Sequence, residues 1–133
     1  CGIGSHFVAA AKIVGSEGRV YATDISPTAL RYVKKAIIKN RLENIEVIKT
    51  SCILNLPNDS MNVVLLYDVY HLLDKPQKVI GELHRVLKDD GILSFTDHHM
   101  KEEDIVLQLT MDCLFKFAYK GDRTHTFEKV KGF

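Results

Sequence analysis

The sequence has 133 residues, 46% of them apolar and 26% charged, which is enough for one globular domain (residues 1–133) and too little for two ordinary ones. Its 18 basic and 17 acidic residues nearly cancel, which argues against nucleic acid or an anionic membrane as the main partner. No apolar run approaches the ~20 residues that span a bilayer, and the three cysteines are scattered, so we expect a cytoplasmic protein with reduced thiols.

Helix and strand signals alternate along the chain. Apolar residues at helical spacing predict a first helix over 5–14 that stops at Gly15. Strands are then predicted over 18–26, 45–51, 62–73 and 91–97, and helices over 27–42, 75–88 and 101–113. Two alternating runs in 114–130, joined at Gly121 and Asp122, predict an antiparallel hairpin. The pattern indicates an α/β fold with a mostly parallel sheet.

Glycines at the start of the chain suggest a ligand-binding turn. Gly2 and Gly4 precede the first helix, whose N–H groups can face an anionic or polar ligand. Asp24 lies twenty residues beyond Gly4 at the end of the next strand, where a carboxylate can accept both hydroxyls of a ribose. Helix capping is the alternative role for Asp24, but Ser26 already fills it ahead of Pro27. The combination predicts a nucleoside site.

The glycine pattern disfavours NAD. A dinucleotide-binding turn reads G-x-G-x-x-G, and its third position here is Phe7. A bulky side chain does not suit the close helix-to-strand packing at that position. Another nucleotide-dependent Rossmann-like enzyme nevertheless remains an alternative.

Five segments and the closing hairpin, in this order, resemble the class I S-adenosylmethionine-dependent methyltransferases. The segments are CGIGS (1–5), VYATDIS (20–26), EVIKTSCILNLP (46–57), NVVLLYDVYHLL (62–73) and RVLKDDGILSFTD (85–97). Within that superfamily the chain is most similar to the small enzymes of the ubiquinone/menaquinone C-methyltransferase type. The resemblance spans essentially the whole chain and implies a Rossmann-like three-layer sandwich with strand order 3-2-1-4-5-7-6.

The first strand of that fold has no counterpart in this sequence. The family's first motif reads D-x-G-C-G-x-G, and Cys1, Gly2 and Gly4 match only its second half. We hypothesise that the sequence is a fragment of a longer polypeptide whose upstream part supplies strand one.

The resemblance implies S-adenosylmethionine as cofactor, with S-adenosylhomocysteine as product. Cys52 is a departure, because the family often has an Asp there for the adenine amino group. Asp24 matches the ribose-binding acid, Ile25 packs on adenine, and Tyr67 lies beside the methionine moiety. The implied cofactor-binding residues are Gly2, Gly4, Ser5, Asp24, Ile25, Cys52, Ile53 and Tyr67.

The implied chemistry is an in-line displacement of a sulfonium methyl group, which needs alignment and exclusion of water more than catalytic side chains. An acidic acceptor still needs a base, and the candidates are Asp68, His71 and His98. Asp68 can instead cap the next turn or bind the methionine amine, and His71 can be a packed helix residue. No metal site is expected, because neighbouring side chains in the segment 97–99 leave a strand on opposite sides.

A small-molecule acceptor is expected, although its identity stays open. The absence of an inserted lid favours a small acceptor covered by upstream residues, or a homo-oligomer that closes the mouth of the site. A non-catalytic module that binds nucleotide or S-adenosylmethionine, or a scaffold, is the alternative function.

Overall fold

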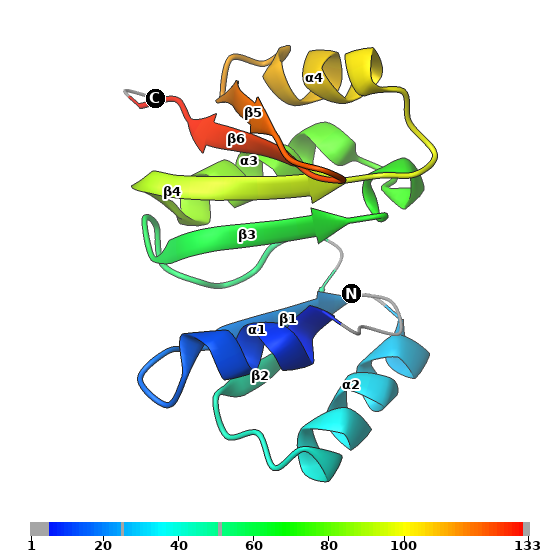
Figure 1. The fold of residues 1–133 in the computed structure, drawn as a ribbon, viewed down its shortest axis with the longest axis vertical. Coiled ribbons are helices and arrows are strands. Elements are labelled where there is room, and N and C mark those ends of the chain that lie inside the picture. Colours follow the sequence, from blue (N-terminus) through cyan, green and yellow to red (C-terminus); the bar gives the residue numbers. More distant parts are fainter. Residues whose placement is uncertain (1–5, 25, 51, 132–133) are drawn as a thin grey trace. The chain divides into compact units, whose positions relative to one another are not determined.

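The computed structural model describes residues 6–24, 26–50 and 52–131 (Figure 1). Two compact units make up the chain, residues 1–54 and 55–133. None of the helices in the described segments is long and apolar enough to cross a bilayer.

The first unit contains two parallel strands and two helices. Its elements are α1 (His6–Val14), β1 (Val20–Asp24), α2 (Pro27–Lys39) and β2 (Ile45–Lys49). β1 and β2 pair in parallel from Val20 opposite Ile45 to Asp24 opposite Lys49. Phe7 of α1 is buried with Ala22 and Val33, which explains the bulky side chain at that position: it supplies part of this unit's core.

Side chains fix the helix ends in this unit. Gly15 ends α1 with a φ of 71°, and the Asn44 amide donates to the carbonyls of Ala11 (2.8 Å) and Gly15 (2.7 Å). The Ser26 hydroxyl accepts from the N–H of Ala29 at 3.3 Å, so the predicted N-cap of α2 is confirmed. α2 ends at Lys39, earlier than predicted. The side-chain amide of Asn40 donates to the Ala36 carbonyl of the last turn, and Arg41 follows with a φ of 53°, which takes the chain out of the helix.

The second unit contains a four-stranded sheet. Its elements are β3 (Met61–Tyr67), a 3₁₀ helix η1 (Tyr70–Leu72), α3 (Pro76–Val86), β4 (Leu87–Thr96), α4 (Glu102–Thr110), β5 (Phe115–Lys120) and β6 (His125–Lys129). The strand order is β3-β4-β6-β5, with β3 parallel to β4 and the β5–β6 pair antiparallel. The predicted hairpin is confirmed.

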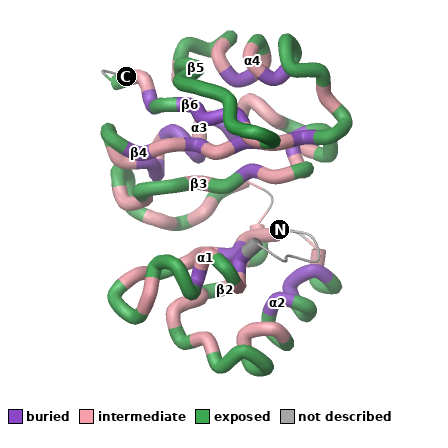
Figure 2. The backbone as a smooth tube through the Cα atoms, viewed as in Figure 1, coloured by how far each residue is buried: buried purple, intermediate pink, exposed green. Residues whose placement is uncertain are grey.

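The core of the second unit is aromatic and aliphatic. Phe95 and Phe127 meet edge to face with ring centroids 6.4 Å apart, and both are fully buried, as is Leu93. Buried positions recur along β4 and β6 (Figure 2). Lys129 is buried at the edge of this core, where its ammonium donates to the Asp59 carboxylate (2.7 Å) and the Leu87 carbonyl (2.6 Å). The burial of that charge is compensated by these two acceptors.

β4 begins earlier than predicted. The sequence predicts a helix ending at residue 88 and a strand starting at 91, but α3 ends at Val86 and the strand follows it directly. A register irregularity opposite Met61 and Val63 accommodates the polar residues 88–90. A Cβ on Gly91 would lie 2.7 Å from the Leu87 side chain, so a residue with a side chain would clash at this position.

The observed topology confirms the α/β Rossmann-like prediction. The two sheets correspond to the 3-2 and 4-5-7-6 parts of the expected strand order. In the segments that the structure describes, no strand corresponds to strand one of that order.

Leu93→Ala is expected to lower the free energy of unfolding by about 2–5 kcal/mol, because it leaves a cavity at a fully buried position. Urea titration followed by circular dichroism measures the change. Leu107→Ala is the matched control, since Leu107 is 60% exposed on α4 and its loss should cost less than about 1 kcal/mol. Equal effects of the two substitutions would contradict this assignment of the core.

Candidate functional site

An aspartate lies at the carboxyl end of three strands, either as the last residue or directly after it. Asp24 is the last residue of β1, Asp68 follows β3 and Asp97 follows β4. Ligands of open α/β sheets bind at the carboxyl ends of the strands, which makes these three carboxylates candidates for ligand contacts.

Asp68 joins the ends of β3 and β4. It has a φ of 56°, and its N–H donates to the Thr96 carbonyl at 2.7 Å, so the chain turns away from the sheet there. One carboxylate oxygen accepts from the backbone N–H (2.8 Å) and the ring Nδ1 (2.7 Å) of His98. The backbone bond from His98 is the main reason why the pKa of Asp68 lies below its ordinary value.

Asp97 is the most enclosed carboxylate of the second unit's strand ends. Its side chain has no exposed area, and its Oδ2 accepts from both the backbone N–H (3.1 Å) and the Nδ1 (2.8 Å) of His71. Its Oδ1 accepts from the backbone N–H of His99 at 2.9 Å. Burial raises the pKa of Asp97, but these hydrogen bonds outweigh burial, and the net pKa is lowered. The carboxylate is therefore ionised near neutral pH.

The hydrogen bond to Asp97 determines the tautomer of His71. An ionised carboxylate only accepts hydrogen bonds, so the Nδ1 of His71 carries a proton, and in the neutral form of the imidazole the lone pair is on Nε2. The ring of His99 packs against that of His71, with centroids 4.1 Å apart. The carboxylate of Asp97 and the ring of His99 thus hold the His71 ring in one orientation.

His71 opens onto a hollow of about 510 Å³, which we call the His71 hollow. It is formed by η1, the start of α3, the loop before α4, and α4. The lining residues are Tyr70, His71, Leu73, Pro76, His99, Met100, Asp104 and Gln108.

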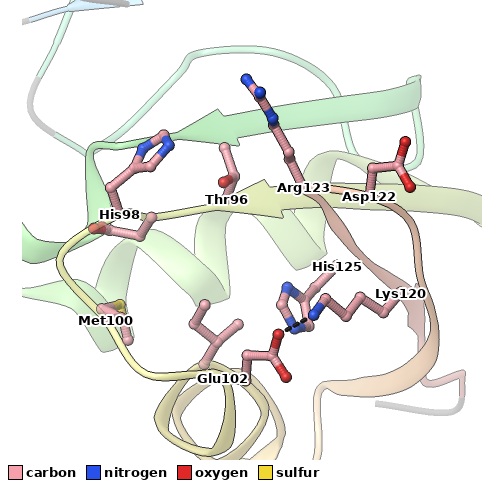
Figure 3. A pocket seen from close by; sticks show the side chains of 10 residues that line it. Thr96, His98, Met100, Glu102, Lys120, Asp122, Arg123 and His125 are labelled. Atoms are coloured by element: carbon pink, nitrogen blue, oxygen red, sulfur yellow. Dashed lines mark hydrogen bonds and ion pairs between the residues drawn. The ribbon is translucent and has the colours of Figure 1, made fainter.

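A second hollow, of about 320 Å³, lies between the end of β4, the start of α4 and the β5–β6 turn (Figure 3). Lys120 forms an ion pair with Glu102 across it. His125 lines it from β6, and burial, aided by Lys120, lowers the pKa of this imidazole. Lys120 and Arg123 both line this second hollow, and no lysine or arginine is among the described residues that line the His71 hollow.

The predicted base candidates lie at neighbouring strand ends. Asp68 and His98 bind each other, whereas His71 binds Asp97, which the sequence analysis weighed only as a metal ligand. The described segments contain no group of three or more side chains arranged to hold a metal ion. A signal for Asp97 was present in the sequence, since it follows its strand as Asp68 does.

The predicted cofactor residues fall into two sets. Gly2, Gly4, Ser5 and Ile25 lie outside the described residues. Of the others, Tyr67 belongs to the second unit, where its hydroxyl lies 2.8 Å from that of Ser94.

The remaining cofactor residues lie at the carboxyl edge of the β1–β2 sheet. The carbonyl of Asp24 accepts from the N–H of Thr50 at 3.1 Å, and its Oδ1 accepts from the N–H of Ser26 at 3.0 Å. Ile53 follows β2 and is 65% exposed, with its carbonyl held by the Thr50 hydroxyl at 2.6 Å. A carboxylate and an exposed apolar side chain at adjacent strand ends fit the ribose and the adenine of an adenosine group. Cys52 is half-buried beside them.

Comparisons with known proteins agree with this fold. A family described as a methyltransferase domain matches residues 1–130. An arsenite methyltransferase from Halobacterium salinarum is 32% identical over 98 residues, which cover 72% of this chain and 25% of that protein. A demethylmenaquinone methyltransferase from Geobacillus stearothermophilus is 30% identical over 93 residues, 69% of this chain and 40% of that protein. The chain thus spans well under half the length of these curated relatives.

A crystal structure of a SAM-dependent methyltransferase from Aquifex aeolicus has the same fold. The TM-score is 0.82 at 24% identity, and the match covers 96% of this chain and 77% of that one. Because the family model matches residues 1–130, the chain belongs to the methyltransferase-domain family. Its strand order and its structural similarity show the Rossmann-like fold of the class I S-adenosylmethionine-dependent enzymes.

Proposed function

We propose that this chain transfers a methyl group from S-adenosylmethionine to a small-molecule acceptor, with His71 as the general base. The observation that carries the proposal is the hydrogen bond between the enclosed Asp97 carboxylate and the Nδ1 of His71, because it leaves Nε2 ready to take a proton. Similarity to an arsenite methyltransferase and to a demethylmenaquinone methyltransferase supports a small acceptor.

The residues of the first unit would hold the adenosine part of the cofactor. Asp24 would accept hydrogen bonds from the ribose hydroxyls, and Ile53 would pack against adenine. Gly2, Gly4, Ser5 and Ile25 remain part of this proposal on the family resemblance. The bound cofactor supplies an electrophilic methyl group on a sulfonium centre.

In the second unit, His71 would take the acceptor's proton at Nε2. Asp97 would act as a positioning residue that keeps the ring in one tautomer and stabilises the imidazolium once it forms. Asp68 would hold His98 through two hydrogen bonds, so that His98 keeps a fixed position at the end of β4. Asp68 and His98 remain weaker candidates for the base, since both side chains are more exposed.

A non-catalytic module is the alternative, and the following measurements separate it from an enzyme. Such a module would bind S-adenosylhomocysteine and release no product with any acceptor tried.

Asp24→Asn is expected to weaken S-adenosylhomocysteine binding about 10- to 100-fold, the effect of losing hydrogen bonds to a charged acceptor. Asparagine keeps an oxygen for the N–H of Ser26, so the start of α2 is preserved. Isothermal titration calorimetry measures the affinity, and Asp89→Asn, an exposed position on β4, is the control. Unchanged affinity in the Asp24 variant would remove the ribose role.

His71→Ala is expected to lower kcat/KM by about 10²- to 10⁴-fold, the usual contribution of a general base, without changing S-adenosylhomocysteine affinity. Release of S-adenosylhomocysteine is measured with arsenite, a naphthohydroquinone and benzyl mercaptan as acceptors. An equal loss of cofactor affinity in this variant would point to a structural role for His71.

Asp97→Asn should change the tautomer of His71, which ¹⁵N chemical shifts of the ring report directly. Because the folded-state pKa of Asp97 lies below the unfolded value of about 3.9, its contribution to stability is present above about pH 4 and is lost as the pH falls through the folded pKa. The difference in urea midpoint between wild type and variant should therefore shrink below about pH 4. Asp90→Asn, an exposed carboxylate on the same strand, should show neither effect.

A further inference from the structure

Charge is distributed unequally between the two units. Residues 1–54 include eight basic and four acidic residues, whereas residues 55–133 include ten basic and thirteen acidic ones. The near balance of charge over the whole chain therefore does not hold within the first unit, which has four more basic than acidic residues. Between Asp24 and Glu43 the sequence has five basic residues and no acidic one.

Most of these basic residues lie on α2. Its exposed cationic side chains are Arg31, Lys34, Lys35 and Lys39. The first, third and fourth of these follow one another at four-residue intervals, and so they form one row along the helix. Within the described part of the chain, none of the four forms an ion pair with a carboxylate. Like charges at this spacing weaken a helix, so the row does not stabilise α2 itself.

Two large side chains with apolar surface are exposed beside this row. Ile38 is 78% exposed and Tyr32 is 56% exposed. Each lies three residues from Lys35, one before it and one after it, so both border the basic row. The first unit buries the other side of α2, through residues such as Leu30 and Val33. We call the exposed side the α2 face; it consists of Arg31, Tyr32, Lys34, Lys35, Ile38 and Lys39.

The composition of the α2 face matches the surface of an anionic lipid bilayer. Lysine ammonium groups are attracted to negatively charged phospholipid headgroups, and their long aliphatic stems lie well against apolar surface. Tyrosine suits the depth of the headgroups, and an isoleucine can be buried at the boundary with the acyl chains. Nucleic acid would also attract the cations, but its phosphate backbone offers no apolar surface to Ile38.

We propose that the α2 face binds reversibly to a membrane that contains anionic phospholipids, with α2 parallel to the plane of the bilayer. The four cations supply electrostatic attraction, and Ile38 and Tyr32 enter the headgroup region. Methyl transfer is not part of this inference, which applies equally to the non-catalytic alternative.

Sedimentation of the full chain with lipid vesicles tests the proposal. Binding is expected with an equimolar mixture of phosphatidylglycerol and phosphatidylcholine, and not with phosphatidylcholine alone. Added salt should weaken the binding, because the cations are exposed and their attraction is screened. A chain that does not bind the equimolar vesicles at low salt would overturn the proposal.

The double substitution Lys34→Gln and Lys35→Gln should lower the partition coefficient about 30-fold, because each basic residue near an anionic surface contributes about fivefold. Glutamine is a good helix former, so α2 is preserved, and circular dichroism checks this. The matched control is Lys75→Gln with Lys78→Gln, which removes the same charge at exposed positions of the second unit. Equal losses in the two double variants would show an effect of net charge alone and would overturn the α2 face as the binding site.

Insertion of Ile38 is tested by fluorescence, since the chain contains no tryptophan. In Ile38→Trp, the emission should shift to shorter wavelength with the equimolar vesicles and should be quenched by brominated acyl chains. Leu107→Trp, at an exposed position on α4, should show neither effect. Sedimentation without a shift in the Ile38 variant would contradict the proposed orientation. Binding to a DNA duplex but not to the vesicles would identify nucleic acid as the partner instead and overturn the proposal.

Discussion

The enclosed Asp97 carboxylate organises the second unit's strand ends. It receives three hydrogen bonds, two from His71 and one from His99, and so connects the end of β4 to η1 and to the loop before α4. A carboxylate without exposed area would be costly to bury unless such donors surrounded it. The same bonds that satisfy it also fix the ring of His71, so local stability and the orientation of the proposed base depend on one group.

Hydrogen bonds also connect the strand ends of the first unit. Asp24 accepts from Ser26 before α2, while the Ser26 hydroxyl caps that helix. The backbone carbonyl of Asp24 also holds Thr50 after β2, and the Thr50 hydroxyl in turn holds the carbonyl of Ile53. Adjacent parallel strands thus bring the ribose and adenine candidates to one edge because the turns after them are bonded to each other.

The two hollows of the second unit differ in charge although both border the end of β4. The Lys120–Glu102 ion pair and Arg123 line one of them, whereas the other is lined by two imidazoles and a single carboxylate, that of Asp104. Hollows with different lining charges favour different ligands, because opposite charges attract and like charges repel.

The sequence by itself determined the alternation of strands and helices, the closing hairpin and the Ser26 cap, because apolar periodicity and capping chemistry act over a few residues. It also named Asp68, His71 and His98 as base candidates. The strand predicted over 62–73 ends at Tyr67, and so the structure puts Asp68 and His71 after it. Only the tertiary structure decided that His71 pairs with Asp97 and Asp68 with His98, since these partners lie 26 and 30 residues apart and meet only when β3 and β4 align in register. The strand that was expected to start at residue 91 begins at Leu87 because Leu87 pairs with Met61 of β3, and residues 88–91 are taken up in the register irregularity that follows.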